Sequence, residues 1–399
     1  MRGKVTVRGR GLVLHWRARR FYLDTVLLTA SLGLLLLGYV MVASASLHLG
    51  EKLADDSFYF PRNQLIHIAL GLFSGCIVAS IKLEVWQKSS LGLFLLGLVL
   101  LAVVLIPGVG KTVNGSSRWL SLLGIRIQVS EVFKLIAVIY TASYIHRHLR
   151  TVRNSVQGMI RPLALLSMGG LLLLMEPDFG ATAVIMATAL GMLFLGGARL
   201  WQFGILLGLM AAAAVGLIFS AEYRLKRLFS FMNPWEHPLD TGFQLTQALI
   251  AFGRGEWTGV GLGSSVQKLF YLPEAHTDFL FSIIGEELGL LGTTTVVLLF
   301  MLIVWRALVI GQLADRAENR FGAFVAYGIG IWFGLQSFIN MGVNMGMLPT
   351  KGLTLPLMSY GGGSMIVMCA ALGLLFRIRS EALDAYAAAP RVRAKWAHV

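Results

Sequence analysis

Apolar residues of this chain fall in long blocks that are separated by short polar stretches. A helix needs about 20 apolar residues to cross a hydrocarbon core of about 30 Å, so the blocks predict about ten transmembrane helices. The expected fold is an all-α polytopic membrane protein. The predicted spans cover residues 23–46, 63–83, 90–107, 128–146, 162–176, 179–197, 202–220, 279–305, 322–345 and 353–376.

The same pattern divides the chain into a membrane domain, residues 23–379, and two cytoplasmic tails, 1–22 and 380–399. Residues 221–278, between the seventh and eighth spans, form the only long loop, which is expected on the extracytoplasmic (periplasmic) side. Within that loop Leu245, Leu249 and Phe252 recur at helical spacing, which predicts a short helix lying at the membrane interface.

Composition agrees with the membrane assignment, because 56% of residues are hydrophobic and only 14% are charged. Soluble domains carry nearer a quarter charged residues. The net charge of +14 would suit nucleic acid, but Lys and Arg crowd the tail before the first span, which is typical of a cytoplasmic end. We therefore predict both termini in the cytoplasm and no nucleic-acid partner. Cys76 and Cys369 lie in apolar segments and predict neither a disulfide nor a metal site.

Charged residues inside predicted spans are candidates for function, because burying charge in a membrane is expensive. Glu131 and Lys134 lie three residues apart on one face of the fourth span, where a structural ion pair is an equal alternative. Arg118 and Arg126, in the preceding outer loop, could present positive charge to a phosphate. The Glu176-Pro-Asp178 stretch is interpreted as a turn near the outer surface.

A second group of polar residues, Glu274, His276 and Asp278, leads directly into the eighth span. A carboxylate at this outer mouth can act as a general base, although a helix N-cap is the simpler alternative. The tenth span is interrupted by Pro356 and by the glycines that follow Tyr360, and unwound backbone at membrane depth must be covered by protein or line a cavity. Close helix packing by small residues explains these glycines equally well.

Four stretches combine these polar and glycine-rich motifs, namely Ser117–Leu120 with Gln128–Lys134, Glu176–Gly180, Tyr271–Gly289 and Leu348–Gly362. Taken together, they resemble the SEDS family of bacterial shape, elongation, division and sporulation proteins. The resemblance covers nearly the whole chain, and further stretches around residues 233–238, 244–247, 252–256 and 265–268 resemble the division-type (FtsW) branch more than the elongation-type (RodA) branch. Val129 and Gly363 depart from the family pattern without affecting an ionisable group.

The resemblance implies a peptidoglycan glycosyltransferase that polymerises lipid II in septal cell-wall synthesis. The family's proposed catalytic aspartate corresponds to Asp278, its important lysine to Lys134 and the arginine before it to Arg126. Transfer would invert the α-linked sugar diphosphate to a β-1,4 glycan, with Asp278 as general base. The expected substrate-binding residues are Arg118, Arg126, Glu131, Lys134, Lys268, Glu274 and His276.

The resemblance also implies partners and a location. The expected partners are an FtsI-like class B penicillin-binding transpeptidase and division proteins of the FtsQ, FtsL, FtsB and FtsN type. The expected location is the inner membrane at the division septum. The sequence has no dedicated metal cage, although Mg or Mn could assist the diphosphate. Two alternatives stay open, a flippase that transports lipid II and a non-catalytic division scaffold.

Overall fold

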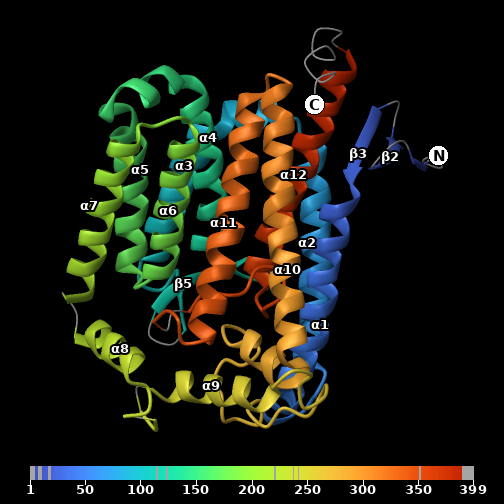
Figure 1. The fold of residues 1–399 in the computed structure, drawn as a ribbon, viewed down its shortest axis with the longest axis vertical. Helices are drawn as coiled ribbons and strands as arrows, with labels where there is room; N and C mark the ends of the chain where they lie inside the picture. The colour runs from blue at the N-terminus through green and yellow to red at the C-terminus, as the bar shows by residue number, and fades with distance from the viewer. Residues whose placement is uncertain are drawn as a thin grey trace.

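The long helices of the chain run side by side along its longest axis (Figure 1). This computed structural model describes residues 5–7, 11–16, 19–113, 116–122, 125–219, 222–236, 238–240, 242–349 and 352–388. Each predicted span lies largely within a helix of the structure. These helices are α1 (Thr25–Ala54), α2 (Tyr59–Ser80), α3 (Leu83–Val104), α4 (Val129–Asn154), α5 (Val156–Met175), α6 (Phe179–Leu195), α7 (Leu200–Phe219), α10 (Leu280–Arg316), α11 (Arg320–Asn344) and α12 (Gly362–Ala388).

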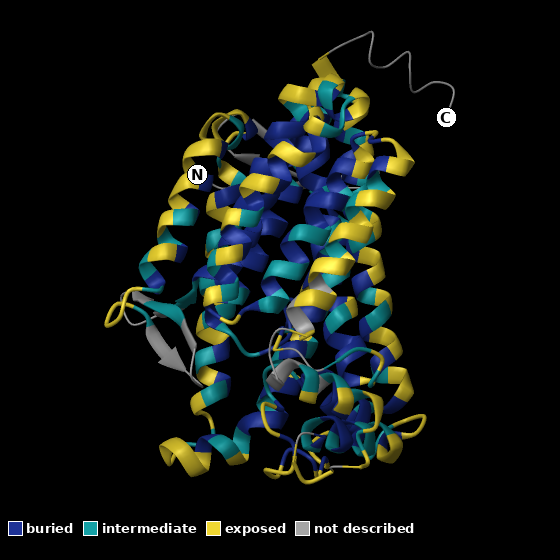
Figure 2. Cartoon of the chain, turned by 90° about the vertical axis from the view of Figure 1, so that its left-hand side faces the viewer, coloured by how far each residue is buried: buried dark blue, intermediate teal, exposed yellow. Residues whose placement is uncertain are grey.

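The distribution of apolar side chains is that of a multi-pass membrane protein. Six of the described helices, α1, α2, α3, α5, α10 and α11, are long and apolar enough to cross a membrane, whereas α6 is a shorter apolar helix. Exposed residues lie on the outward faces of the helices and buried ones between them (Figure 2). Large apolar side chains such as Leu36 and Leu171 are exposed on these faces, as lipid contact requires. The number of crossings stays a prediction.

Close packing of small residues joins α2 to α12. A Cβ atom added to Gly373 would lie 2.3 Å from the Gly75 carbonyl oxygen, and one added to Gly71 would lie 2.9 Å from Cys369 Sγ. Larger side chains would therefore separate the two backbones, as at other helix contacts in membranes. Cys369 and Gly373 lie in the second and fourth turns of α12, so this contact fixes α12 beyond the predicted interruption of the last span.

The all-α expectation was incomplete, because two small antiparallel sheets accompany the helices. One lies in the N-terminal segment that was expected to be a simple tail, and the other lies between α3 and α4. Both segments alternate apolar and polar residues, as in Ile125-Arg-Ile-Gln128, and this period of two is typical of strands. The strands are β1 (Val5–Val7), β2 (Gly11–Trp16), β3 (Arg19–Asp24), β4 (Lys111–Val113), β5 (Ser116–Leu122) and β6 (Ile125–Gln128).

The long loop contains α8 (Glu222–Met232) and α9 (Phe243–Gly255), and α9 confirms the predicted short helix. Rather than facing only lipid, α9 packs on α10, where the Phe252 and Phe281 ring centroids are 5.7 Å apart. The α10 helix is broken at Gly289, whose φ of 63° and ψ of −158° are not helical. The Val260 and Gly261 amides donate hydrogen bonds to backbone oxygens of residues 286 and 287, which fixes the loop to this break.

Candidate active site

Hydrogen bonds to backbone carbonyl oxygens hold the loop that precedes α10 against the non-helical segment before α12. The Tyr360 amide donates to the His276 carbonyl oxygen at 2.9 Å, and Ser359 Oγ donates to the Thr277 carbonyl oxygen at 2.6 Å. Buried carbonyl groups need such partners. The unwound part of the last predicted span therefore serves to position the His276–Asp278 loop.

Two asparagines of α11 fix the backbone at Asp278. The Nδ2 atoms of Asn340 and Asn344 each donate to the Asp278 carbonyl oxygen at 2.9 Å. Asn344 Oδ1 also accepts hydrogen bonds from the Ser282 amide and hydroxyl, in the first turn of α10. Sequence patterns gave no reason to single out these asparagines, which are buried and lie one helical turn apart.

The Asp278 side chain is half-buried, and its environment disfavours its negative charge. Burial, followed by the negative charges of Glu274 and Asp178, raises the pKa of Asp278 to about 7, although Arg118 opposes the shift. A carboxyl group with a pKa near the working pH can both accept and release a proton. The electrostatic coupling also shows that segments far apart in sequence meet here.

Space beside the Asp278 carboxylate is limited by Gly352. A Cβ atom at position 352 would lie 3.0 Å from Asp278 Oδ2, closer than most real contacts. We expect Gly352→Ala to displace the carboxylate and to lower about tenfold the rate of the lipid II polymerisation that the sequence resemblance implies, without unfolding the protein, because small misplacements of reacting groups are costly. Gly361→Ala, where added atoms would meet only ordinary contacts, is the matched control. Equal rates for the two variants, measured on labelled lipid-linked substrate, would contradict the expectation.

The α5–α6 turn brings two further acidic residues to this end of the bundle. Asp178 caps α6, since Oδ1 accepts from the Ala181 amide at 3.0 Å, and Oδ2 accepts from Gln128 Nε2 at 3.2 Å. This supports the predicted turn. Glu176 is only 1% exposed, and within the described part of the chain neither of its carboxylate oxygens has a hydrogen-bond partner. Burial, then Asp178, raises the pKa of Glu176 to about 8, so this side chain is mostly neutral at neutral pH.

Arg118 is bound to the same turn through backbone atoms. Its Nε donates to the Glu176 carbonyl oxygen and its Nη2 to the Pro177 carbonyl oxygen, both at 2.8 Å. A carbonyl oxygen orients the guanidinium group without neutralising it, and the raised pKa of Glu176 removes a nearby negative charge. Arg118 therefore keeps its positive charge close to Asp278. The structure thus adds Glu176 and Asp178 to a site for which the sequence had predicted Arg118 and Asp278.

His276 and Glu274 occupy the rim of the site. The His276 ring lies 5.1 Å from the Phe60 ring and 5.5 Å from the Tyr360 ring, measured between centroids. Burial lowers the pKa of His276, so the imidazole is mostly neutral at neutral pH. Glu274 is exposed and accepts a hydrogen bond from Thr277 Oγ1 at 2.6 Å. Glu274 lies close enough to raise the pKa of Asp278, and the predicted contacts of Glu274 and His276 with substrate stay predictions.

Glu131 and Lys134 form a buried ion pair inside the bundle. Lys134 Nζ lies 2.8 Å from Glu131 Oε1 and 2.7 Å from Gln336 Oε1, and the Lys134 side chain is 1% exposed. Gln336 Nε2 donates to the Thr354 carbonyl oxygen at 3.0 Å, which connects the pair to the segment containing Gly352. These contacts agree with the structural alternative. The predicted contact with substrate stays a prediction.

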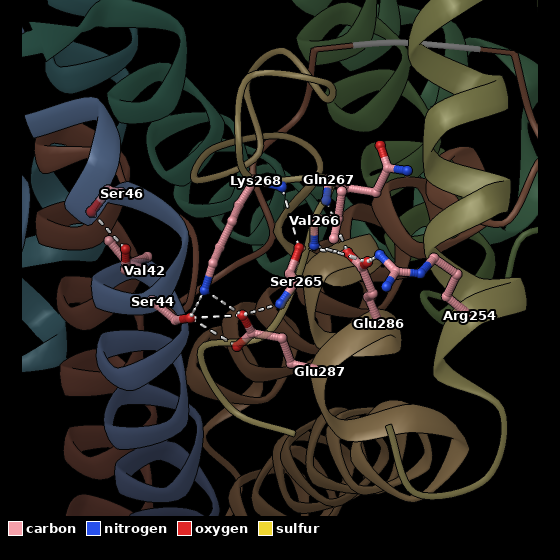
Figure 3. A network of polar contacts seen from close by, with 10 residues as sticks. All are labelled: Val42, Ser44, Ser46, Arg254, Ser265, Val266, Gln267, Lys268, Glu286 and Glu287. Atoms are coloured by element: carbon pink, nitrogen blue, oxygen red, sulfur yellow. Dashed lines mark hydrogen bonds and ion pairs between the residues drawn. The ribbon is translucent and has the colours of Figure 1, made fainter. Parts of the chain in front are cut away.

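Lys268 lies in a separate polar network between α1, α9 and α10 (Figure 3). Its Nζ is 2.8 Å from Glu287 Oε1 and 2.9 Å from Ser44 Oγ. Glu286 Oε1 pairs with Arg254 Nη1 at 2.7 Å and Oε2 accepts from Ser265 Oγ. Lys268 is only 8% exposed and has its ionic partner in place, so the network fixes the loop upstream of Asp278. Its predicted contact with substrate also stays a prediction.

The remaining predictions for the site concern Arg126 and a metal ion. The Arg126 side chain lies outside the described residues, although its backbone belongs to β6. Within the described part of the chain, no group of three or more His, Cys, Asp or Glu side chains could hold a metal ion. The predicted assistance of Mg or Mn at the diphosphate stays a prediction.

Sequence comparisons relate nearly the whole chain to one family. Residues 24–383 match the FtsW/RodA/SpoVE family of cell cycle proteins. A probable peptidoglycan glycosyltransferase FtsW from Methylococcus capsulatus is 72% identical over 381 residues, covering 95% of this chain and 96% of that protein. A protein of the same name from Coxiella burnetii is 48% identical over 90% of this chain and 96% of its own length.

Structural comparisons support the same architecture. A chain from a peptidoglycan synthase complex superimposes with a TM-score of 0.74 and 24% identity, covering 92% of this chain and 99% of that chain. The rod shape determining protein RodA of Thermus thermophilus superimposes with a TM-score of 0.65 and 25% identity, covering 91% and 97% of the two chains. The helical arrangement in Figure 1 is therefore shared with solved membrane proteins.

Proposed function

This chain belongs to the FtsW/RodA/SpoVE family of cell cycle proteins, and we propose that it is a peptidoglycan glycosyltransferase of cell division that polymerises lipid II. Identity of 72% over 95% of the chain with a protein of that name carries the assignment of activity. The grouping of Asp278, Arg118 and Glu176 at one end of the bundle supports the assignment of the site.

In the proposed reaction Asp278 acts as the general base. Its carboxylate accepts the proton of the acceptor sugar's 4-hydroxyl group while that oxygen forms a bond to the anomeric carbon of the donor. The bond from that carbon to the diphosphate oxygen breaks, and the diphosphate leaves with the electron pair. Single displacement converts the α-linkage of the donor to the β-linkage of the product. The pKa of about 7 supports this role, since an ordinary aspartate is a much weaker base.

Arg118 is the described cation best placed to stabilise the leaving diphosphate. Two carbonyl oxygens hold its guanidinium group, whose positive charge can stabilise the negative charge that develops on the diphosphate. Guanidinium groups suit phosphate oxygens because they donate paired hydrogen bonds.

Reconstitution tests the proposed function. The purified chain in lipid vesicles, given labelled lipid II and a class B transpeptidase, is expected to form glycan polymers that an electrophoretic gel resolves. Separate assays with and without the transpeptidase would show whether the partner is required. Movement of lipid II between leaflets without polymer formation would overturn the proposal in favour of a flippase. Absence of both activities would favour the scaffold.

The pH dependence provides a further prediction. Because the base must be deprotonated and the pKa of Asp278 is about 7, the polymerisation rate should rise with pH through neutrality. Below about pH 6 the rate should fall by about tenfold per pH unit, and above about pH 8 it should level off. Initial rates at saturating substrate measure this profile. A rate that stays constant from acid to neutral pH would contradict the assignment of Asp278 as base.

The proposed location is the bacterial inner membrane at the division septum, with both termini in the cytoplasm and Asp278 at the outer end. The proposed partners are an FtsI-like transpeptidase and division proteins of the FtsQ, FtsL, FtsB and FtsN type. Membership of a cell cycle family supports these proposals. Multi-pass insertion in a membrane agrees with the six long apolar helices among the described residues.

A further inference from the structure

The end of the bundle opposite Asp278 carries a strongly cationic edge, at the top of Figure 1. It is formed by the last turns of α4, the first turns of α5 and the α6–α7 connection, and residues 132–175 and 179–221 contain no Asp or Glu. Within the described part of the chain, none of its exposed arginines forms an ion pair. We name the following set the arginine edge: Arg147, Arg150, Arg153, Arg161 and Arg199.

Other connections at the same end mix positive and negative charge. Lys88 pairs with Glu84 at 2.7 Å in the first turns of α3, and Arg377 pairs with Glu381 at 2.7 Å in α12. The α10–α11 turn likewise alternates Asp315, Arg316, Glu318 and Arg320. An excess of Lys and Arg at the cytoplasmic end can set the orientation of the chain in the membrane. That role does not require these unpaired arginines to lie together on one edge of the bundle. The concentration of charge therefore calls for a ligand.

Two guanidinium groups of the edge are already oriented. Arg153 Nε donates to the Gly196 carbonyl oxygen at 3.1 Å, and a Cβ atom at Gly197, where φ is +93°, would lie 2.9 Å from that Nε. Arg147 Nε donates to the Ser143 carbonyl oxygen at 3.3 Å. Only the Nε atoms are used in these contacts, so the terminal nitrogens keep their donors for another partner. An oriented guanidinium loses less freedom when it binds.

We propose that the arginine edge binds the phosphate groups of anionic phospholipids in the adjacent leaflet. Arginine pairs with phosphate through two parallel hydrogen bonds, and clusters of this size next to a span are typical of anionic-lipid binding. Exposed apolar side chains flank the arginines, including Ile160, Leu195 and Leu200. Acyl chains can cover these side chains, which favours a lipid over an acidic soluble protein. The proposal rests on membrane insertion and not on the transferase activity.

Binding can be measured on the full chain in nanodiscs of phosphatidylcholine to which phosphatidylglycerol is added, by native mass spectrometry and by thermal stabilisation. The test variant is Arg150→Gln/Arg161→Gln, whose side chains are exposed. The matched control, Lys82→Gln/Lys88→Gln, removes the same charge at the same end of the bundle. We expect affinity for phosphatidylglycerol to fall about thirtyfold in the test variant, which loses two guanidinium groups that pair with phosphate, and less than about threefold in the control, whose lysines lie outside the arginine edge.

Equal losses in the two variants would overturn the proposal, because general charge would then explain binding. Competition by millimolar inorganic phosphate would assign the edge to small anions instead, and binding of poly-glutamate that phosphatidylglycerol does not displace would assign it to an acidic protein. If the glutamine variant misfolds in phosphatidylcholine, the affinity for phosphatidylglycerol can be measured on Arg150→Lys/Arg161→Lys instead. It keeps the charge but loses the paired donors, so affinity should fall about threefold. Unchanged affinity in that variant would also overturn the proposal.

Discussion

Replacing Asp278 by Asn should lower the polymerisation rate by about a thousandfold, within the range that general bases contribute. The amide has nearly the same shape as the carboxylate, but it cannot accept a proton from the acceptor hydroxyl. The hydrogen bonds from Asn340 and Asn344 reach the backbone oxygen of residue 278, so the loop should keep its position. Single-turnover measurements with labelled lipid II would separate this chemical defect from weaker binding.

The same substitution should make the protein more stable at neutral and alkaline pH. The pKa of Asp278 is about 7 in the folded chain, above its ordinary value of 3.8, so ionisation opposes folding. This destabilisation is absent below about pH 4, grows as the pH rises and is complete above about pH 7. The unfolding temperature of Asp278→Asn should exceed that of the parent at about pH 8 and match it at about pH 4. A variant that is inactive and also less stable at both pH values would indicate misfolding instead of a lost base.

Apolar blocks were sufficient to predict the helices of the bundle, but they underestimated how far the helices extend. The span predicted at 128–146 is part of α4, which continues to Asn154, and the span predicted at 279–305 is part of α10, which continues to Arg316. Arg147 and Arg150 extend α4 beyond the apolar core, since charged side chains reach the interface while the backbone stays helical. Hydropathy indicates whether a segment lies in lipid or in water, but it does not indicate where a helix ends, because a helix can continue from the lipid into the water.

Sequence neighbours and Arg118 were predicted to belong to the site, whereas the contacts between distant segments that hold Arg118 there were not. Glu274, His276 and Asp278 follow one another, so one loop brings them together. Arg118 binds the Glu176 carbonyl oxygen across 58 positions of the chain. Such contacts depend on how the helices pack, and spacing along the chain carries no information about that packing. The burial that raises the pKa of Glu176 likewise results from how the helices pack.

Removing the positive charge of Lys268 should cost about 3–5 kcal/mol of stability, because it leaves a buried negative charge without its counterion. The Lys268 side chain is 4% exposed and that of Glu287 is fully buried. Lys268→Met would leave Glu287 with hydrogen bonds from Ser44 Oγ at 2.8 Å and the Ser265 amide at 3.3 Å. Thermal and denaturant unfolding in nanodiscs measure the loss. Arg254→Gln is the comparison within the network, and it should cost less because Arg254 is 41% exposed and water weakens its pair with Glu286.

A second substitution distinguishes a structural Lys268 from one that binds substrate. In Lys268→Met/Glu287→Gln both charges are gone, while the amide oxygen of the new side chain can still accept from Ser44 and Ser265. If Lys268 serves to hold the loop upstream of Asp278, the double variant should recover most of the lost stability and polymerisation together. If instead its ammonium contacts the substrate diphosphate, stability should return without activity. Replacement of both members of a buried ion pair is often tolerated. If neither stability nor polymerisation recovers in the double variant, the ion pair itself, and not charge balance alone, fixes the loop.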